Sequence, residues 1–176
     1  MANGKVLVLL FIAAVPFHLL FKYRTKTLRD VSGVNNPTLD SDFFHTPQTA
    51  YQLFGKLDDP SRQLYAWTEI TADLIFPVIY SLFLSLLLIC IFRKLSSVRV
   101  QQTLAMLPLM AMLSDFCENI LIAFMLFAYP QVYLGVAWAA SLFTKLKWIL
   151  LTASLAAILF GLVGLVIKAL SKTKQD

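Results

Sequence analysis

Four long apolar runs constrain this chain more than any other feature of its sequence. They cover residues 6–22, 64–92, 104–129 and 134–167, and a helix needs roughly 20 apolar residues to cross a bilayer. The 176 residues are 59% hydrophobic and only 14% charged, against about 25% charged in an ordinary soluble domain. One soluble core cannot bury so many apolar side chains. We therefore predict an all-α, integral membrane four-helix bundle.

The first run also has the length of a signal-peptide core. No small-x-small cleavage site follows it, so we favour a retained span over a cleaved signal. Lys5, Lys22 and Tyr23 would anchor the two ends of this short span in the interfaces.

Residues 23–63 are polar, rich in turn-forming residues and too short for an independent domain. Thr46-Pro47 is typical of an N-cap followed by proline at the first helical position, which predicts a short amphipathic helix. Asp59-Pro60 repeats the pattern, and we expect a second helix to run from there unbroken into the second span. This segment would form a small helical cap over one end of the bundle.

The fourth run is longer than one crossing requires. Its 34 residues, 134–167, would make about 50 Å of helix, beyond the ~30 Å hydrocarbon core. Either the helix tilts and protrudes, or its first third lies along the interface. Lys145 and Lys147 mark the place where the two arrangements differ.

Basic residues gather on the side of the bundle that holds both termini. With four spans, that side carries Lys5, Arg93, Lys94, Arg99, Lys168, Lys172 and Lys174 against Asp176 alone. The positive-inside rule then places both termini in the cytoplasm or its equivalent compartment. The basic stretch KYRTKTLR, directly after the first span, argues the other way.

Two spans carry polar residues on one face. Asp115, Glu118 and Asn119 lie at i, i+3 and i+4 in the third span. In the second, the shared face carries Glu69, Asp73, Pro77 and Tyr80. A central charge facing lipid costs about 2.5–3.5 kcal/mol on insertion scales, so both faces should turn inward.

Folding the hairpins places these faces at similar depths. A turn near residue 131 sets Glu118 level with position 144 and Asp115 level with Lys147. A turn near residue 97 sets Asp115 level with Tyr80. The candidate intramembrane ligand site comprises Asp73, Tyr80, Asp115, Glu118, Asn119, Lys145 and Lys147.

Three interpretations of this polar layer stay open. It can be a satisfied ion pair that holds helices together, at ~0.6 kcal/mol per hydrogen bond. It can be a ligand, proton or ion site. Alternatively, the lysines lie in the headgroups and the acids line a wet crevice alone. Pro77 predicts a kink, and it also frees a backbone carbonyl near Asp73, a feature of binding sites.

Signatures of other protein classes are missing from the sequence. There is no phosphate-binding glycine loop, metalloprotease motif or nucleophile elbow, and we predict no catalytic residues, cofactor or metal. Cys90 and Cys117 lie in apolar runs and read as small hydrophobic residues. Charges lie at the edges of apolar runs without the basic-aromatic pattern of nucleic-acid binding.

The segment YAWTEITADLIFPVIYSLFL and the later SDFCENILIAFML resemble a widespread group of uncharacterised small four-helix membrane proteins. That group pairs D-x-x-F-P-x-x-Y on the second span with D-x-x-E-N on the third. The resemblance covers about residues 47–130. It departs at Pro60, Ser61 and Arg62, where a glycine-arginine pair is expected. It implies a shared polar layer and no particular activity.

From the sequence we expect first a structural or accessory subunit of a membrane assembly, in contact with lipids and with partner subunits or further copies of itself. The alternative is a small lipid-, metabolite- or ion-binding or transport protein that uses the intramembrane carboxylates. An intramembrane enzyme comes third.

Overall fold

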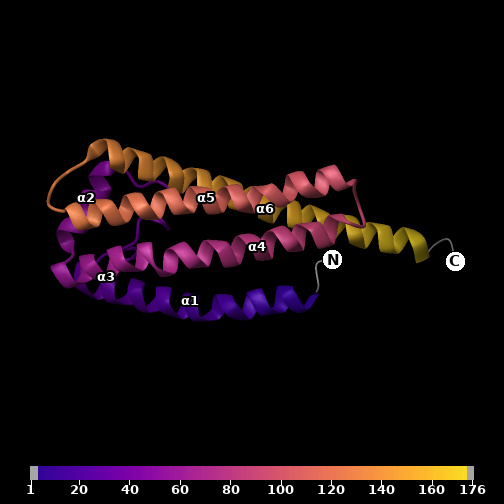
Figure 1. Cartoon of the computed structure of the whole chain (residues 1–176), viewed down its shortest axis with the longest axis horizontal. Coiled ribbons are helices and arrows are strands. Elements are labelled where there is room, and N and C mark those ends of the chain that lie inside the picture. Colours follow the sequence, from indigo (N-terminus) through magenta and orange to yellow (C-terminus); the bar gives the residue numbers. More distant parts are fainter. Residues whose placement is uncertain (1–3, 174–176) are drawn as a thin grey trace.

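The computed structural model describes residues 4–173 and is built from helices alone in that range (Figure 1). The helices are α1 (Gly4–Ser32), α2 (Pro47–Lys56), α3 (Asp59–Ile70), α4 (Ala72–Phe92), α5 (Val98–Ala128) and α6 (Leu134–Thr173). The predicted all-α bundle with a small helical cap is confirmed. The short helices α2 and α3 lie at the end of the bundle opposite to the termini; we call this the cap end.

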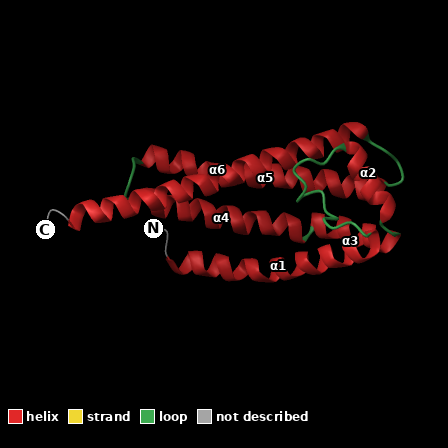
Figure 2. Ribbon diagram, turned by 180° about the vertical axis from the view of Figure 1, so that it is seen from behind, coloured by secondary structure: helices red, strands yellow, loops and turns green. Residues whose placement is uncertain are grey.

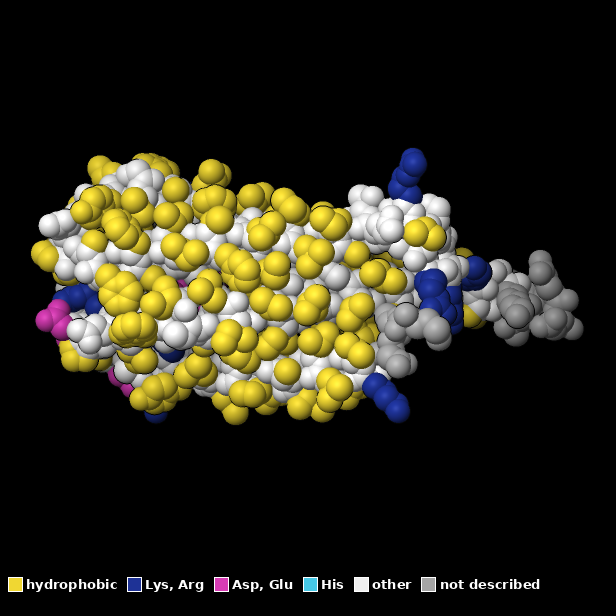
Figure 3. All heavy atoms as spheres, viewed as in Figure 1, with side chains coloured by type: hydrophobic (Ala, Val, Ile, Leu, Met, Phe, Trp, Pro, Cys, Tyr) yellow, Lys and Arg dark blue, Asp and Glu magenta, His cyan; other side chains and the backbone are white. Residues whose placement is uncertain are grey.

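Four long helical stretches are apolar enough to cross a membrane: Gly4–Ser32, Asp59–Phe92, Val98–Ala128 and Leu134–Ser171. Apolar side chains cover the middle of the visible face, and lysine and arginine side chains gather near the end that holds the termini (Figure 3). This distribution is that of a multi-pass membrane protein. Within the bundle, α5 packs against α6 and α4, while α1 packs mainly on α4.

Helix α1 is longer than its apolar run. It continues ten residues past the predicted end of the span at residue 22 and takes in the basic stretch KYRTKTLR. Its only buried side chains are Arg24 and Leu28, which lie one turn apart on the face turned towards the bundle. The extension therefore places an arginine inside the protein.

The second span is not the unbroken helix that we predicted. At Thr71 the backbone leaves the helical region, with φ −120° and ψ −83°, and separates α3 from α4. The Thr71 N–H bonds to the Thr68 carbonyl instead of the Trp67 carbonyl. The Thr71 hydroxyl donates to the released Trp67 carbonyl over 2.5 Å, so the break leaves that acceptor satisfied. Pro77 lies further along, inside α4.

The cap helices begin as their sequences indicate. Thr46 caps α2, and its hydroxyl and that of Thr49 form a reciprocal capping box. The carboxylate of Asp58, rather than that of Asp59, caps α3 by accepting from the Ser61 N–H over 3.0 Å. Hydrogen bonding from the Ser61 side chain, together with that from its backbone N–H, lowers the pKa of Asp58 below its ordinary value.

The segment between α1 and α2 lies against the cap end of the bundle (Figure 2). Hydrogen bonds to α3 and α6 hold its backbone. The Leu39 N–H donates to the Tyr65 hydroxyl over 2.7 Å, and the carbonyls of Asp40 and His45 accept from Trp148 and Ser141 of α6 over 3.0 and 2.8 Å. These contacts hold the segment, including the Asp40 backbone, against α6 and α3.

Helix α6 is continuous. Its 40 residues extend for about 60 Å, and the helix passes beyond the other helices towards the C-terminus (Figure 1). A continuous helix is compatible with the arrangement in which the fourth run tilts and protrudes, and how its first third lies in a membrane stays a prediction.

Candidate functional site

Lys147 of α6 forms the centre of a buried cluster between α4, α5 and α6. Its ammonium lies 2.6 Å from Glu118 Oε2 and 3.3 Å from Asp115 Oδ1. The Tyr80 hydroxyl donates to Asp115 over 2.9 Å, and the Thr144 hydroxyl donates to Glu118 over 2.8 Å. We call these five residues the lysine cluster.

The pairing follows the depths expected from the hairpin turns. Lys147 meets Asp115, position 144 meets Glu118, and Tyr80 meets Asp115. Lys145 is half-buried and makes no ion pair in the described part of the chain. Two residues turn a helix by about 200°, so the two lysines point in different directions and only Lys147 faces the acids.

Asn119 completes the hydrogen bonding of α4. Proline at position 77 has no N–H to donate to the carbonyl of Asp73, four residues earlier. The Asn119 side-chain amide donates to that carbonyl over 2.5 Å. The backbone acceptor that the sequence predicts to be free is therefore occupied by α5.

A second buried cluster surrounds Arg24. The guanidinium donates to Glu69 over 2.8 Å, to Asp40 over 3.2 Å and to Asp73. Arg24 and Glu69 are 2% and 0% exposed, so these charges are almost wholly removed from water. Carboxylate oxygens of the three acids lie within 4.8 Å of one another, close enough to ligate a metal ion. Arg24 already bonds to all three, and we assign this group, the arginine cluster, to ion pairing.

Three residues of these clusters, Arg24, Asp40 and Thr144, were not predicted from the sequence. Arg24 belongs to a basic stretch that resembles an interfacial anchor, and its spacing to Leu28 was the only available signal. Asp40 belongs to the irregular segment between α1 and α2. Such a segment has no sequence periodicity from which the position of Asp40 could be predicted. Glu69 was predicted on the same face as Asp73, but without a partner.

Asp40, a member of the arginine cluster, is also attracted electrostatically to Lys147 of the lysine cluster. Burial raises its pKa, but attraction to Arg24 and Lys147 outweighs burial and leaves the pKa below the ordinary value of 3.8. Asp40 is therefore ionised at neutral pH. Its side chain is still 21% exposed, and the Oδ1 atom has no hydrogen-bond partner among the described residues.

Both clusters open onto one cavity of about 540 Å³. Side chains of α1, the connecting segment, α4, α5 and α6 line it. Its charged and hydroxyl-bearing walls include Arg24, Asp40, Asp73, Tyr80, Asp115 and Lys147. Its apolar walls include Phe21, Phe76, Leu84, Trp148 and Leu151. The cavity is open on one side, so it joins buried charges to an apolar surface.

Of the seven residues predicted for the site, four line the cavity: Asp73, Tyr80, Asp115 and Lys147. Glu118 and Asn119 lie behind them, where they hold Lys147 and the Asp73 backbone. Lys145 takes no part in these contacts.

Fold and site together define a multi-pass membrane protein with a charged cavity between its helices. No protein-family model, curated protein or solved structure matches this chain.

Proposed function

We propose that this protein binds a small amphipathic molecule, of the lipid or metabolite class, in the cavity between α1 and α6. The proposal rests on the cavity, because the cavity combines the polar and the apolar surface that an amphipathic molecule needs. Buried polar groups surround one part, and side chains such as Leu84 and Leu151 line another. Ligand sites typically join an apolar wall to a few placed polar groups in this way.

The depth of the cavity supports an amphipathic ligand. Helix α4 has 21 residues and a length of about 31 Å, close to the thickness of the hydrocarbon core. Asp73 lies in its first turn, so the arginine cluster lies near the cap-end boundary between acyl chains and headgroups. Leu84 lies about three turns deeper. A bound molecule would keep its polar part at the boundary and its apolar part among acyl chains.

Exchange of Asp115 for asparagine tests this function. Asp115→Asn removes a charge from the cavity wall but preserves shape, and Lys147 keeps its contact with Glu118. We expect the variant to fold and to lose the small molecules that co-purify with the wild type, measured by native mass spectrometry. Asp59→Asn, the same exchange at an exposed position, is the matched control.

Retention of the same molecules by folded Asp115→Asn would contradict the binding function. Alternatively, less Asp115→Asn protein could fold while the folded part keeps its bound molecules. That outcome would identify Asp115 as a structural residue only.

A role as an accessory subunit is the second candidate. Apolar side chains are exposed on α3, α5 and α6 around the cap end, among them Trp67, Phe127 and Trp138. Trp67 and Phe127 stack edge to face at 5.6 Å and form a continuous aromatic surface. Partner helices or a second copy would cover such a surface. Mass spectrometry of proteins isolated with this chain in mild detergent would identify a partner.

A further inference from the structure

The two clusters contain more acids than bases. Five carboxylates, of Asp40, Glu69, Asp73, Asp115 and Glu118, face the two cations of Arg24 and Lys147. A buried carboxylate without a counter-charge costs several kcal/mol. Three of the five acids, Asp40, Asp73 and Asp115, line the cavity. A cationic group in the cavity would therefore be attracted to several carboxylates at once.

Aromatic rings line the same cavity. Phe76 contacts Phe21 at 5.3 Å and Tyr80 at 5.6 Å, both nearly edge to face. All three rings belong to the cavity wall. Carboxylates beside aromatic faces are the surroundings that recognise an ammonium group, because ring quadrupoles add to the ionic attraction.

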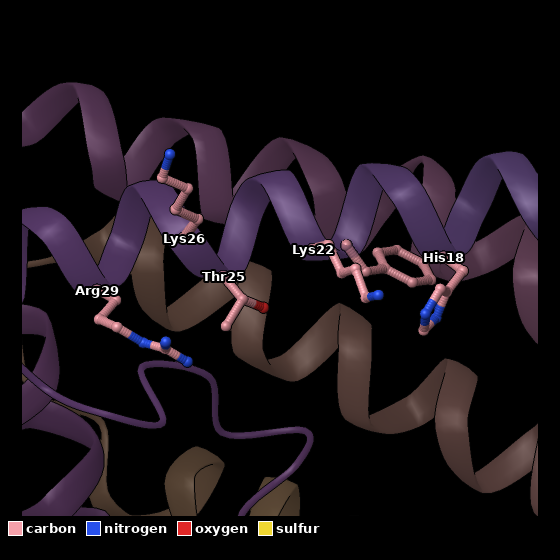
Figure 4. A pocket seen from close by; sticks show the side chains of 6 residues that line it. His18, Lys22, Thr25, Lys26 and Arg29 are labelled. Atoms are coloured by element: carbon pink, nitrogen blue, oxygen red, sulfur yellow. The ribbon is translucent and has the colours of Figure 1, made fainter.

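A basic hollow of about 380 Å³ adjoins this cavity on α1. His18, Lys22, Thr25 and Arg29 lie at i, i+4, i+7 and i+11, and their side chains point to the same side of the helix (Figure 4). Lys26 also lines the hollow, and none of the carboxylates that the structure describes does. Phe21 and Thr25 line both the hollow and the cavity, so the two spaces are neighbours. A phosphate held by Lys22 and Arg29 would lie next to the carboxylate-lined cavity.

We propose that the ligand is a zwitterionic phospholipid. Its ammonium group occupies the cavity beside Asp73 and Asp115, and its phosphate lies in the basic hollow. An acyl chain follows Leu84 and Leu151 into the bilayer. This inference rests on the proposed binding function and names the ligand class of the same cavity.

The position of the hollow fits this arrangement. Lys22 follows the last apolar residue of the first run, so the hollow begins where the hydrocarbon surface of α1 ends. Lysine and arginine at this level contact lipid phosphates. The cavity and the hollow thus lie at the depth of a phospholipid headgroup.

Three lipid-like probes separate the chemical groups. The protein, purified in mild detergent, is mixed with a phosphatidylethanolamine, a phosphatidic acid with the same acyl chains, and a long-chain primary amine. Binding is measured by native mass spectrometry. We expect the phosphatidylethanolamine to bind most tightly, the amine less tightly and the phosphatidic acid most weakly.

Charge-removing variants then locate the two halves of the headgroup. Lys22→Gln with Arg29→Gln should weaken phosphatidylethanolamine binding by about tenfold or more and leave binding of the amine unchanged. Lys5→Gln is the matched control, since this exposed lysine lies on the same helix but lines neither the hollow nor the cavity. Asp115→Asn should weaken both amine-containing probes.

The outcomes separate failure of the phospholipid proposal from failure of the proposed binding function. Tightest binding of phosphatidic acid, or equal effects of the Lys5 and Lys22/Arg29 variants, would overturn the zwitterionic ligand and leave a binding cavity in place. Binding of the amine without binding of phosphatidylethanolamine, if Asp115→Asn abolishes it, would also overturn the zwitterionic ligand and leave a binding cavity in place. If Asp115→Asn changes the binding of none of the probes and of none of the co-purified molecules, both proposals fail. Arg29 Nε also donates to the Asn35 carbonyl over 3.1 Å. The single Lys22→Gln exchange, at an exposed side chain, leaves that bond in place and keeps the test independent of folding.

Discussion

At the scale of single residues, Pro77 creates a hydrogen-bonding problem that Asn119 solves. The proline leaves the Asp73 carbonyl without its helical donor inside the bundle, and Asn119 of α5 supplies one over 2.5 Å. Asn119 is 1% exposed, so water cannot substitute for it. This bond ties α5 to the turn of α4 that also presents the Asp73 carboxylate to Arg24. The position of one cavity acid thus depends on a residue outside the cavity.

A double-mutant cycle measures this dependence. We expect Asn119→Leu to lower the free energy of unfolding by about 1–3 kcal/mol, because a buried carbonyl loses its donor. In a Pro77→Ala background the cost should be smaller, since this exchange restores a backbone N–H that can donate to the same carbonyl. Denaturant unfolding in detergent micelles gives both values. An equal cost in the two backgrounds would contradict the assigned role of Asn119.

Lys147 supports a second prediction at this scale. Lys147→Met would remove the cation from Asp115 and Glu118 and should destabilise the protein by about 3–5 kcal/mol, since it leaves uncompensated buried charge. A further Glu118→Gln exchange should restore part of the loss. Lys145→Met is the control, and we expect a change within about 0.5 kcal/mol. Equal melting temperatures for the two lysine variants would refute the ion-pair geometry.

At the scale of elements, the connecting segment depends on a neutral histidine. His45 is buried, its ring Nδ1 lies 2.8 Å from the Asp42 carbonyl, and its own carbonyl accepts from Ser141 of α6. Burial is the main cause that lowers the pKa of His45 below 6.5. The nearby Asp42 opposes this shift, whereas the charges of Lys145 and Lys147 add to it. The folded protein therefore disfavours protonation of this ring.

The sign of the resulting pH dependence follows from the unfolded chain. Unfolded His45 takes up a proton as the pH falls below about 6.5, whereas the folded protein takes it up only at lower pH. Its contribution to stability is full above about pH 6.5 and is lost as the pH falls below that value. We expect melting temperatures between about pH 7.5 and 5.5 to fall less for His45→Asn than for the wild type. Parallel curves would show that His45 contributes nothing to the pH dependence.

Elements with a strong periodic signal could be predicted from the sequence. The spacing of Asp115, Glu118 and Asn119 identified an inward face, and the hairpin depths brought it to Lys147 and Tyr80. Arg24 could not be predicted in this way, because the end of an apolar run does not show whether the helix continues. Nor could Asp40, because an irregular segment has no period, and tertiary contacts alone fix its course. The cavity, which depends on both residues, was therefore beyond prediction.

At the scale of the whole molecule, the helices place charges at two levels. Arg93 and Lys94 follow α4, and Arg99 lies in the first turn of α5, at the end that also holds the termini. At the other level, α1 carries Lys22, Lys26 and Arg29 beyond its apolar run. Both sets of cations compete for the cytoplasmic side under the positive-inside rule. The set at the end that holds the termini is the larger of the two once Lys5 and the C-terminal lysines are added. We therefore predict that the end with the termini is cytoplasmic.

Single cysteines can test this orientation, since Cys90 and Cys117 are free and can be replaced by alanine. In sealed membrane vesicles whose cytoplasmic face is outward, a membrane-impermeant maleimide should label Ser97→Cys and leave Asn36→Cys at the cap end unlabelled until the vesicles are opened. The opposite pattern would reverse the orientation. Because the two basic sets compete, neutralising Arg93, Lys94 and Arg99 should produce mixed labelling, whereas neutralising Lys22, Lys26 and Arg29 should leave one orientation. If neutralising Arg93, Lys94 and Arg99 leaves labelling unchanged, these charges do not determine how the chain inserts.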